Sequence, residues 1–248
     1  MVKVITRRRA RRKKNRRTCD TCSMAEDVLT LKVCVHLVQG YTPEFDWGVA
    51  KPKLNDQGVQ SVFNIVNRIW EGGGIEFKAK VYSPKTKYRG DVYSGGRMDE
   101  IERLFDTDSN CMRSIGDVNV FVVPQIPEGV YGYWTRTDGK EFIVIGEYLE
   151  GARSKAGLAN TFAHELGHWL GLFHTNEMDN LMGEFGDEYE TQIELNPNQV
   201  RTARENALAI IKMRRLPSRM KRRIRKRAGD VFIPYFRSTP GGRVIRIK

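Results

Sequence analysis

The sequence predicts a layered α+β fold, in which a twisted mixed β-sheet packs against three main helices. Alternating apolar residues at 28–38 and at 75–82 indicate strands, and the segment between them, 56–70, has the spacing of an amphipathic helix. Strand candidates at 118–123 and 141–149 follow, and two further helical patterns complete the order of elements. With 248 residues and a hydrophobic content of 40%, the chain is long enough to bury a substantial core.

The first part of the chain predicts a strand, a helix and a second strand. Alternate positions of the first strand share one face and are all apolar: Leu29, Leu31, Val33, Val35 and Leu37. Apolar residues then recur every three or four positions from Val59 to Trp70, which is the pattern of a helix with one buried side. Three consecutive glycines at 72–74 end this helix, and the next strand runs from Ile75 to Tyr82.

The remaining elements are two strands around a turn and two helices. Residues 130–134 and 141–149 form strands on either side of Thr137-Asp138-Gly139-Lys140. A helix follows whose apolar face is made by Leu158, Phe162, Leu166, Trp169 and Leu170. The last helix begins at Asn196-Pro197, because asparagine is a favoured N-cap and proline a favoured first helical residue.

The residues with the clearest chemistry lie at 164–174, where the sequence is His-Glu-Leu-Gly-His-Trp-Leu-Gly-Leu-Phe-His. His164 and His168 are four residues apart, so on a helix both imidazoles point to the same side. Gly171 accepts the left-handed backbone that ends a helix and reverses the chain, which returns His174 to the other two. Three of the four histidines of the chain lie in these 11 residues.

Three imidazoles in this arrangement predict a site for one Zn²⁺, about 2.0–2.1 Å from each nitrogen. Three protein ligands leave a fourth position open for water or substrate, which is typical of a catalytic zinc rather than a structural one. Glu165 is placed to take a proton from that water. The competing interpretation, a helix with incidental core histidines, suits a bare His-Glu-x-x-His better than this extended motif.

Met182 follows His174 by eight residues, in Asp179-Asn180-Leu181-Met182-Gly183. An extended histidine motif followed by such a methionine resembles the metzincin zinc metalloproteases, and the spacing and the Leu-Met pair are most similar to the matrixin branch. The chain departs from matrixins directly after Met182, where their Tyr-Pro is replaced by Gly183-Glu184.

The resemblance implies a metzincin-like zincin domain with an active-site helix and a closing C-terminal helix. It implies that Zn²⁺ is held by His164, His168 and His174, that Glu165 is the general base and that Met182 packs beneath the metal. It further implies that the strand before the active-site helix is an open edge, to which a protein or peptide substrate adds as a further strand. By position we expect that strand to be 141–149.

The charge pattern divides the chain into three segments. Residues 1–17 and 212–228 each hold ten Lys or Arg and no acid, and removing those twenty positive charges from a net charge of +12 leaves −8. We therefore expect a basic N-terminal arm at 1–27, a catalytic domain at 28–213 and a basic C-terminal extension at 214–248. The arms have three interpretations: solvated tails, a nuclear localisation signal, or contacts to nucleic acid or another polyanion without sequence preference.

The sequence contains no pattern typical of a signal peptide or of a membrane span. The basic start is not followed by an apolar run of signal-peptide length, and no stretch has the apolar length of a membrane span. We therefore expect an intracellular or virion-associated protein, with the nucleus as one alternative.

Four cysteines without a signal do not indicate a disulfide scaffold. The resemblance to matrixins, whose precursors block the zinc with an upstream thiolate, implies such a role for Cys19 or Cys22, which lie in a Cys-x-x-Cys upstream of the domain.

Together these features predict a zinc-dependent endopeptidase that acts near a polyanion or nucleoprotein assembly. The alternative belongs to another class, namely a structural component of a large assembly that retains the zinc fold with little or no proteolysis. The acid at Glu165 argues against the alternative, because a purely structural zinc needs no base beside it.

Overall fold

The structure is a computed structural model, and it describes residues 27–38, 40–41, 49–50, 53–82, 117–126, 131–137, 140–148, 154–177, 179–183, 194–217 and 219–220. The elements that carry the fold are, in chain order, β1 (Leu29–Leu37), α1 (Asp56–Trp70), β4 (Ile75–Tyr82), β5 (Val118–Gln125), β6 (Gly132–Thr137), β7 (Lys140–Tyr148), α3 (Lys155–Trp169) and α4 (Pro197–Arg214). Smaller elements are β2 (Gly40–Tyr41), β3 (Val49–Ala50) and the 3₁₀ turn η1 (Glu71–Gly73).

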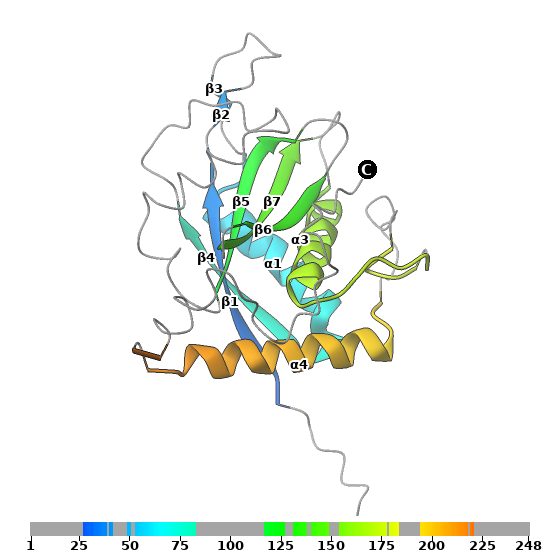
Figure 1. Ribbon diagram of the computed structural model, residues 1–248. Helices are drawn as coiled ribbons and strands as arrows, with labels where there is room; N and C mark the ends of the chain where they lie inside the picture. The colour runs from blue at the N-terminus through cyan, green and yellow to red at the C-terminus, as the bar shows by residue number, and fades with distance from the viewer. Residues whose placement is uncertain are drawn as a thin grey trace, which may run out of the picture.

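The main sheet has five strands in the order β4-β1-β5-β7-β6. The first four are parallel to their neighbours, and β6 runs antiparallel to β7 in a hairpin. This mixed α+β arrangement confirms the predicted fold class, and Figure 1 shows α1 behind the sheet, α3 beside β6 and α4 across the end where β1 begins. The expectation that 141–149 is the open edge is wrong: β7 is paired on both sides, and β6 is the outer strand at its end of the sheet.

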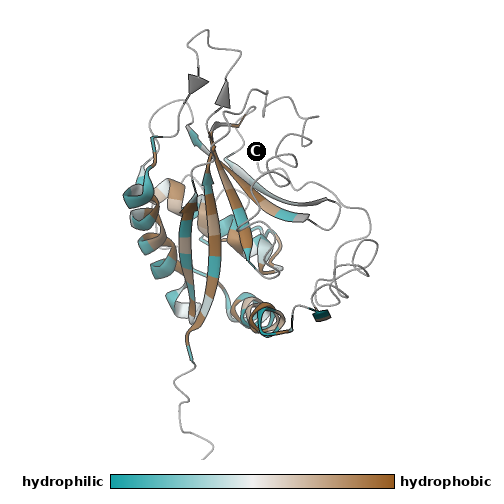
Figure 2. Cartoon of the chain, turned by 90° about the vertical axis from the view of Figure 1, so that its left-hand side faces the viewer, coloured by the Kyte–Doolittle hydropathy of each residue, from teal (hydrophilic) through white to brown (hydrophobic). Residues whose placement is uncertain are grey.

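Helix α1 has the one-sided pattern that its sequence predicts. The side chain of Asn55 accepts a hydrogen bond from the Gly58 backbone and caps the N-terminus. Gly74 ends the following turn with a φ of 60°, a left-handed conformation that favours glycine. The helix buries Val59, Val62, Phe63, Val66 and Trp70, whereas Figure 2 shows hydrophilic residues on the side that faces away from the sheet.

The core lies between the sheet and the two helices α1 and α3. Phe63 of α1 meets Phe162 of α3 edge to face, with ring centroids 5.4 Å apart. The strands contribute the alternate apolar residues that the sequence predicts for this face, among them Leu31, Val33 and Val120, which have no exposed surface. Because α1 and α3 pack on each other as well as on the sheet, the position of α3 is fixed from two sides.

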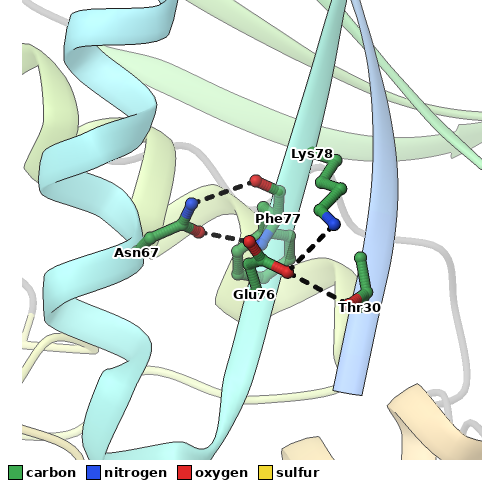
Figure 3. Close-up of polar contacts among 5 residues, drawn as sticks. All are labelled: Thr30, Asn67, Glu76, Phe77 and Lys78. Carbon is green, nitrogen blue, oxygen red and sulfur yellow. Dashed lines mark hydrogen bonds and ion pairs between the residues drawn. The ribbon is translucent and has the colours of Figure 1, made fainter. Parts of the chain in front are cut away.

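Polar side chains join α1 to the outer strand β4. The Asn67 amide donates to the Phe77 carbonyl at 3.1 Å and accepts from the Phe77 backbone nitrogen at 2.8 Å (Figure 3). On the same strand, the Glu76 carboxylate accepts from the Thr30 hydroxyl of β1 and pairs with Lys78 (Figure 3). These contacts lie on the α1–β4 side of the domain, and α3, which packs on α1, contacts the sheet at β6 and β7, on the opposite edge.

Helix α4 fastens the end of the domain where β1 begins. The Arg204 guanidinium donates to the carbonyl oxygens of Gly73, Gly74 and Asp27. At the C-terminal end of the helix, Arg214 pairs with Asp117 at 2.6 Å, and both side chains are largely buried. The first residues of the basic segment 212–228 therefore belong to the folded helix, and Arg214 is occupied by an internal ion pair.

Several predictions of the sequence fall largely outside the described residues. These are the arm at 1–17, most of 212–228, and Cys19 and Cys22. The boundaries at 27, 213 and 214 therefore stay predictions. Among the residues that the structure does describe, no helix combines the length and the apolar character needed to cross a membrane.

Candidate metal centre

Helix α3 is a buried platform that carries two of the three histidines. Ser154 caps its N-terminus by accepting from the Gly157 backbone, and every residue from Leu158 to Trp169 is buried. The helix ends at Trp169, and Gly171 has a φ of 81°, so the chain turns back at the glycine that the sequence singled out. The reversal places His174 against His164 and His168.

The three imidazoles converge through the same ring atom. The Nε2 atoms of His164 and His168 lie 3.0 Å apart, and each lies 3.1 Å from Nε2 of His174. Nitrogens that surround a tetrahedral Zn²⁺ at its usual bond length are about 3.3 Å apart, so the cluster has the dimensions of such a site. Within the described residues, this group of three histidines is the cluster whose ligand atoms gather closely enough to hold a metal ion.

Backbone carbonyls fix the tautomers of the two buried rings. Nδ1 of His164 lies 2.7 Å from the Leu181 carbonyl oxygen, and Nδ1 of His168 lies 2.9 Å from that of Leu172. A carbonyl oxygen only accepts, so each Nδ1 carries the proton and each Nε2 presents its lone pair to the centre. This is the tautomer that a metal ligand needs.

Burial keeps the same rings neutral. Desolvation, more than the neighbouring His174, lowers the pKa of His164 to about 4. Desolvation, together with the charge of His164, also lowers the pKa of His168 well below its ordinary value. Both imidazoles are therefore neutral at pH 7, and the lone pair of each Nε2 is available to a cation. The residues present thus fit Zn²⁺.

Met182 lies under the histidine helix and has no exposed surface. It contacts α3 at Gly167, where a Cβ atom would come within 2.5 Å of the Met182 sulfur. The Met182 carbonyl also accepts from the Thr175 backbone at 2.8 Å, next to His174. The turn that contains Met182 therefore touches both the helix and the returning chain.

Glu165 is fully buried between α3 and the outer strand β6. A Cβ atom at Gly132 of β6 would lie 3.2 Å from Cγ of Glu165 and 2.9 Å from Cγ2 of Thr161. Glycine at this position therefore lets the β6 backbone approach the side chain of Glu165, the residue that follows His164 in the chain. The edge of the sheet and the histidine cluster meet at Glu165.

Of the seven predicted site residues, the structure brings His164, His168 and His174 together, sets Met182 against their helix and buries Glu165 against β6. Cys19 and Cys22 lie outside the described residues. Sequence reasoning missed Gly132, Gly167 and Asn180, which shape or hold the site. Only Asn180 had a usable signal, because it precedes the Leu-Met pair and an asparagine side chain commonly accepts from the backbone two residues on.

Comparisons with known proteins agree with this geometry. The matrixin family model matches residues 73–206, more than half of the chain, and the match includes the whole histidine motif and Met182. The chain is 27% identical over 165 residues to an extracellular metalloprotease of Pyricularia oryzae, and this aligned segment covers 62% of this chain and 54% of that protein. It is 28% identical over 135 residues to one from Arthroderma benhamiae, covering 50% and 43%.

The match spans about half the length of these curated relatives. Among solved structures, metalloproteinase-II from Bacteroides fragilis superposes with a TM-score of 0.50 at 12% identity, covering 73% of this chain and 55% of that one. At such low identity the superposition supports the fold alone.

The expected intracellular or virion-associated location is wrong. The curated relatives are named extracellular metalloproteases, from four fungi. The sequence did not indicate a disulfide scaffold, yet Cys34 is disulfide-bonded. Its partner lies outside the described residues. Disulfides persist in oxidising compartments, so this bond agrees with the names of the relatives.

The histidine motif, the turn at Met182, the mixed sheet and the family match over residues 73–206 lead to one conclusion. The chain belongs to the matrixin family of zinc metallopeptidases.

Proposed function

We propose that this chain is a zinc-dependent endopeptidase, in which His164, His168 and His174 hold the metal and Glu165 is the general base. The observation that carries the proposal is the convergence of three Nε2 atoms within 3.0–3.1 Å, with two of the rings oriented by backbone carbonyls. Three ligands of this kind leave a coordination position open, which is what catalysis requires.

The zinc and Glu165 have separate roles in peptide hydrolysis. A bound Zn²⁺ would lower the pKa of the attacking water and polarise the scissile carbonyl. Glu165 follows His164 on the helix and lies against β6, which supports the role of its carboxylate as the group that accepts the proton of the attacking water. The same carboxyl group can then pass that proton to the leaving amine, which completes hydrolysis without a covalent intermediate.

We propose that the substrate binds along β6. This strand is one of the two outer strands of the described sheet, the other being β4, and its inner side pairs with β7 from Gly132 to Thr137. A peptide added as a further strand would form backbone hydrogen bonds at the outer side of β6. Gly132 lies against Glu165, so a peptide held there passes close to the base and the histidines.

Cleavage of a mixed peptide library by the purified chain tests the proposal, with Glu165→Gln as the matched variant. Glutamine keeps the shape of the side chain but cannot accept the proton, so we expect unchanged zinc content and a kcat/KM lower by about 10²–10⁴. Zinc in both proteins and cleavage by neither, even after treatment that releases a blocking thiol, would overturn the endopeptidase proposal. That result would support the structural alternative, which stays a prediction.

The thiol block by Cys19 or Cys22 also stays a prediction. Its test is the double variant Cys19→Ser and Cys22→Ser, assayed beside the parent chain. A gain in cleavage by the double variant is the expected result, and equal activity would exclude the block.

We further propose that the protein works outside the cell, as the names of its relatives and the disulfide at Cys34 suggest.

A separate proposal is that residues 1–17 and 212–228 contact nucleic acid or another polyanion. Arg214 is paired with Asp117, so the exposed side chains Lys212, Arg215 and Arg219 are the better targets within the second segment.

Retention on heparin measures this contact. Deleting 1–17 and replacing Lys212, Arg215 and Arg219 by Gln leaves the helix and its internal ion pair intact, and we expect elution at lower salt. Unchanged elution would exclude polyanion binding through these residues.

A further inference from the structure

The closing helix α4 and the turn that carries Met182 are joined by two primary amides. The Asn180 side chain donates to Oε1 of Gln199 at 2.9 Å, and Nε2 of Gln199 donates back to Oδ1 of Asn180 at 2.9 Å. The two side chains thus form a reciprocal pair between segments 19 residues apart in sequence. Gln199 also belongs to the N-terminal cap of α4, where its Oε1 accepts from the Asn196 backbone at 2.9 Å.

Every hydrogen-bonding position of the Asn180 amide is used. Its nitrogen donates to Gln199 and to the Glu177 carboxylate, and its oxygen accepts from Gln199 and from the Met182 backbone at 2.9 Å. An amide has two donors and two acceptor lone pairs, so this side chain is saturated, and it is only 4% exposed. Aspartate would lose both donors, and a shorter side chain would lose all four contacts.

The residue between Asn180 and Met182 is the one that orients a histidine. The Leu181 carbonyl accepts from Nδ1 of His164 at 2.7 Å. The Leu181 carbonyl and the Met182 nitrogen belong to one peptide group, and that nitrogen donates to the Asn180 side chain. Asn180 therefore fixes the peptide group that sets the tautomer and ring direction of His164.

We propose that Asn180 and Gln199 are positioning residues for the metal centre, through which the N-terminus of α4 holds the Leu181 carbonyl against His164. The proposal rests on the proposed zinc site and adds residues that touch neither metal nor substrate. Partners of metal ligands typically contribute 10–100-fold to metal affinity. A role limited to folding would change stability and leave the affinity unchanged.

The test compares Asn180→Ala, Gln199→Ala and their double variant with a matched asparagine far from the site. Asn67 is suitable, because its amide makes two hydrogen bonds to the Phe77 backbone on the α1–β4 side of the domain (Figure 3). Zinc dissociation constants of the full chain are measured by competition with a chromophoric chelator. The visible spectrum of the cobalt-substituted protein reports the geometry of the ligands.

We expect Asn180→Ala to weaken zinc binding about 10–100-fold and to shift the cobalt bands. The double variant should bind no more weakly than Asn180→Ala, because the two amides act as one unit. Asn67→Ala should lower stability and leave the dissociation constant within about threefold, as expected for a site that does not contact it. Equal zinc affinity in Asn180→Ala and Asn67→Ala would overturn the proposal.

A second readout needs no metal. Long-range ¹H–¹⁵N correlation spectra of the metal-free chain report which nitrogen of His164 carries the proton. We expect the Nδ1–H form in the parent and in Asn67→Ala, and a mixture of tautomers in Asn180→Ala. If the parent binds no zinc, the proposed function fails, and this spectrum still decides the positioning role, because an unchanged tautomer in Asn180→Ala excludes it.

One variant guards against a failure to fold. Gln199→Glu keeps the acceptor for the Asn196 backbone and removes only the N–H that donates to Asn180. If Asn180→Ala does not fold, the same comparisons are made with Gln199→Glu, with a smaller loss of zinc affinity expected and an unchanged affinity and tautomer contradicting the proposal.

Discussion

Gly167 and Met182 form a contact whose energetic consequence can be worked out from the geometry. A Cβ atom at position 167 would lie 2.5 Å from the Met182 sulfur and 3.3 Å from its methyl carbon. Nonbonded heavy atoms prefer about 3.5–4.0 Å, so Gly167→Ala requires the buried methionine to move by about an ångström. Met182 is fully buried and its backbone nitrogen is bound by Asn180, so the movement is resisted.

The effect of Gly167→Ala on the free energy of unfolding should change sign when Met182 is replaced by alanine. In the parent, overpacking at Gly167→Ala should reduce the free energy of unfolding by about 1–3 kcal/mol. Met182→Ala removes the obstacle at its own cost of about 2–5 kcal/mol. In that background the next neighbour is Cδ1 of Leu172 at 3.6 Å, an ordinary contact. Gly167→Ala should then stabilise the helix by about 0.5–1 kcal/mol, because alanine is the better helix former.

Urea unfolding of the four metal-free proteins measures both effects, and the coupling energy between the two positions should be about 1.5–4 kcal/mol. Metal-free protein is used so that changes in zinc affinity do not enter the result. The matched comparison is Gly58→Ala on α1, which has no contact with Met182 and should show the same effect in both backgrounds. An equal destabilisation by Gly167→Ala with and without Met182 would refute the steric argument.

Three further predictions concern stability. Burial lowers the pKa of His164 to about 4, so the unfolded chain binds this proton first as the pH falls. This residue should contribute about 2 kcal/mol to the loss of stability of the metal-free protein between pH 7 and pH 5, and the similarly buried His168 adds to that loss. Urea unfolding measures the loss, and an equal pH dependence in the parent and in His164→Asn would contradict this assignment. Asp117→Asn should cost about 1–3 kcal/mol because Arg214 loses its largely buried partner, and adding Arg214→Met should recover part of that loss; no recovery would argue against the pair. Removing zinc with a chelator should lower the melting temperature of the parent and leave that of His174→Ala unchanged, and equal shifts would place the metal elsewhere.

Local signals in the sequence were sufficient for most elements. The predicted limits of the strand Ile75 to Tyr82 and of the helix 56–70 are those of β4 and α1. They were predictable because each is set within its own segment, by apolar periodicity and by a cap or glycine at its end. The convergence of the three histidines also followed from the sequence, since a helix period and one left-handed glycine place them together.

The order of the strands in the sheet was not set by local sequence patterns of this kind. The hairpin 132–148 could be predicted from its turn, yet which of its two strands lies at the edge depends on which one pairs with β5. β7 contains the continuous apolar run 142–145 that is typical of an inner strand, whereas β6 ends in Thr135-Arg136-Thr137, so composition favours β7 inside the sheet. The edge was assigned by position alone, as the strand before the active-site helix. The substrate edge was consequently assigned to β7, whereas β6 is the outer strand.

By itself, the sequence determined the class of the fold, the helix that presents His164 and His168, the glycine that returns His174, and the family resemblance. These depend on interactions between residues close in the chain, which spacing records directly. Only the tertiary structure decided that Gly132 brings β6 against Glu165, that Met182 rests on Gly167, and that Asn180 pairs with Gln199. Those contacts join segments that meet only after the sheet and helices have packed, and no local pattern specifies which residues will meet.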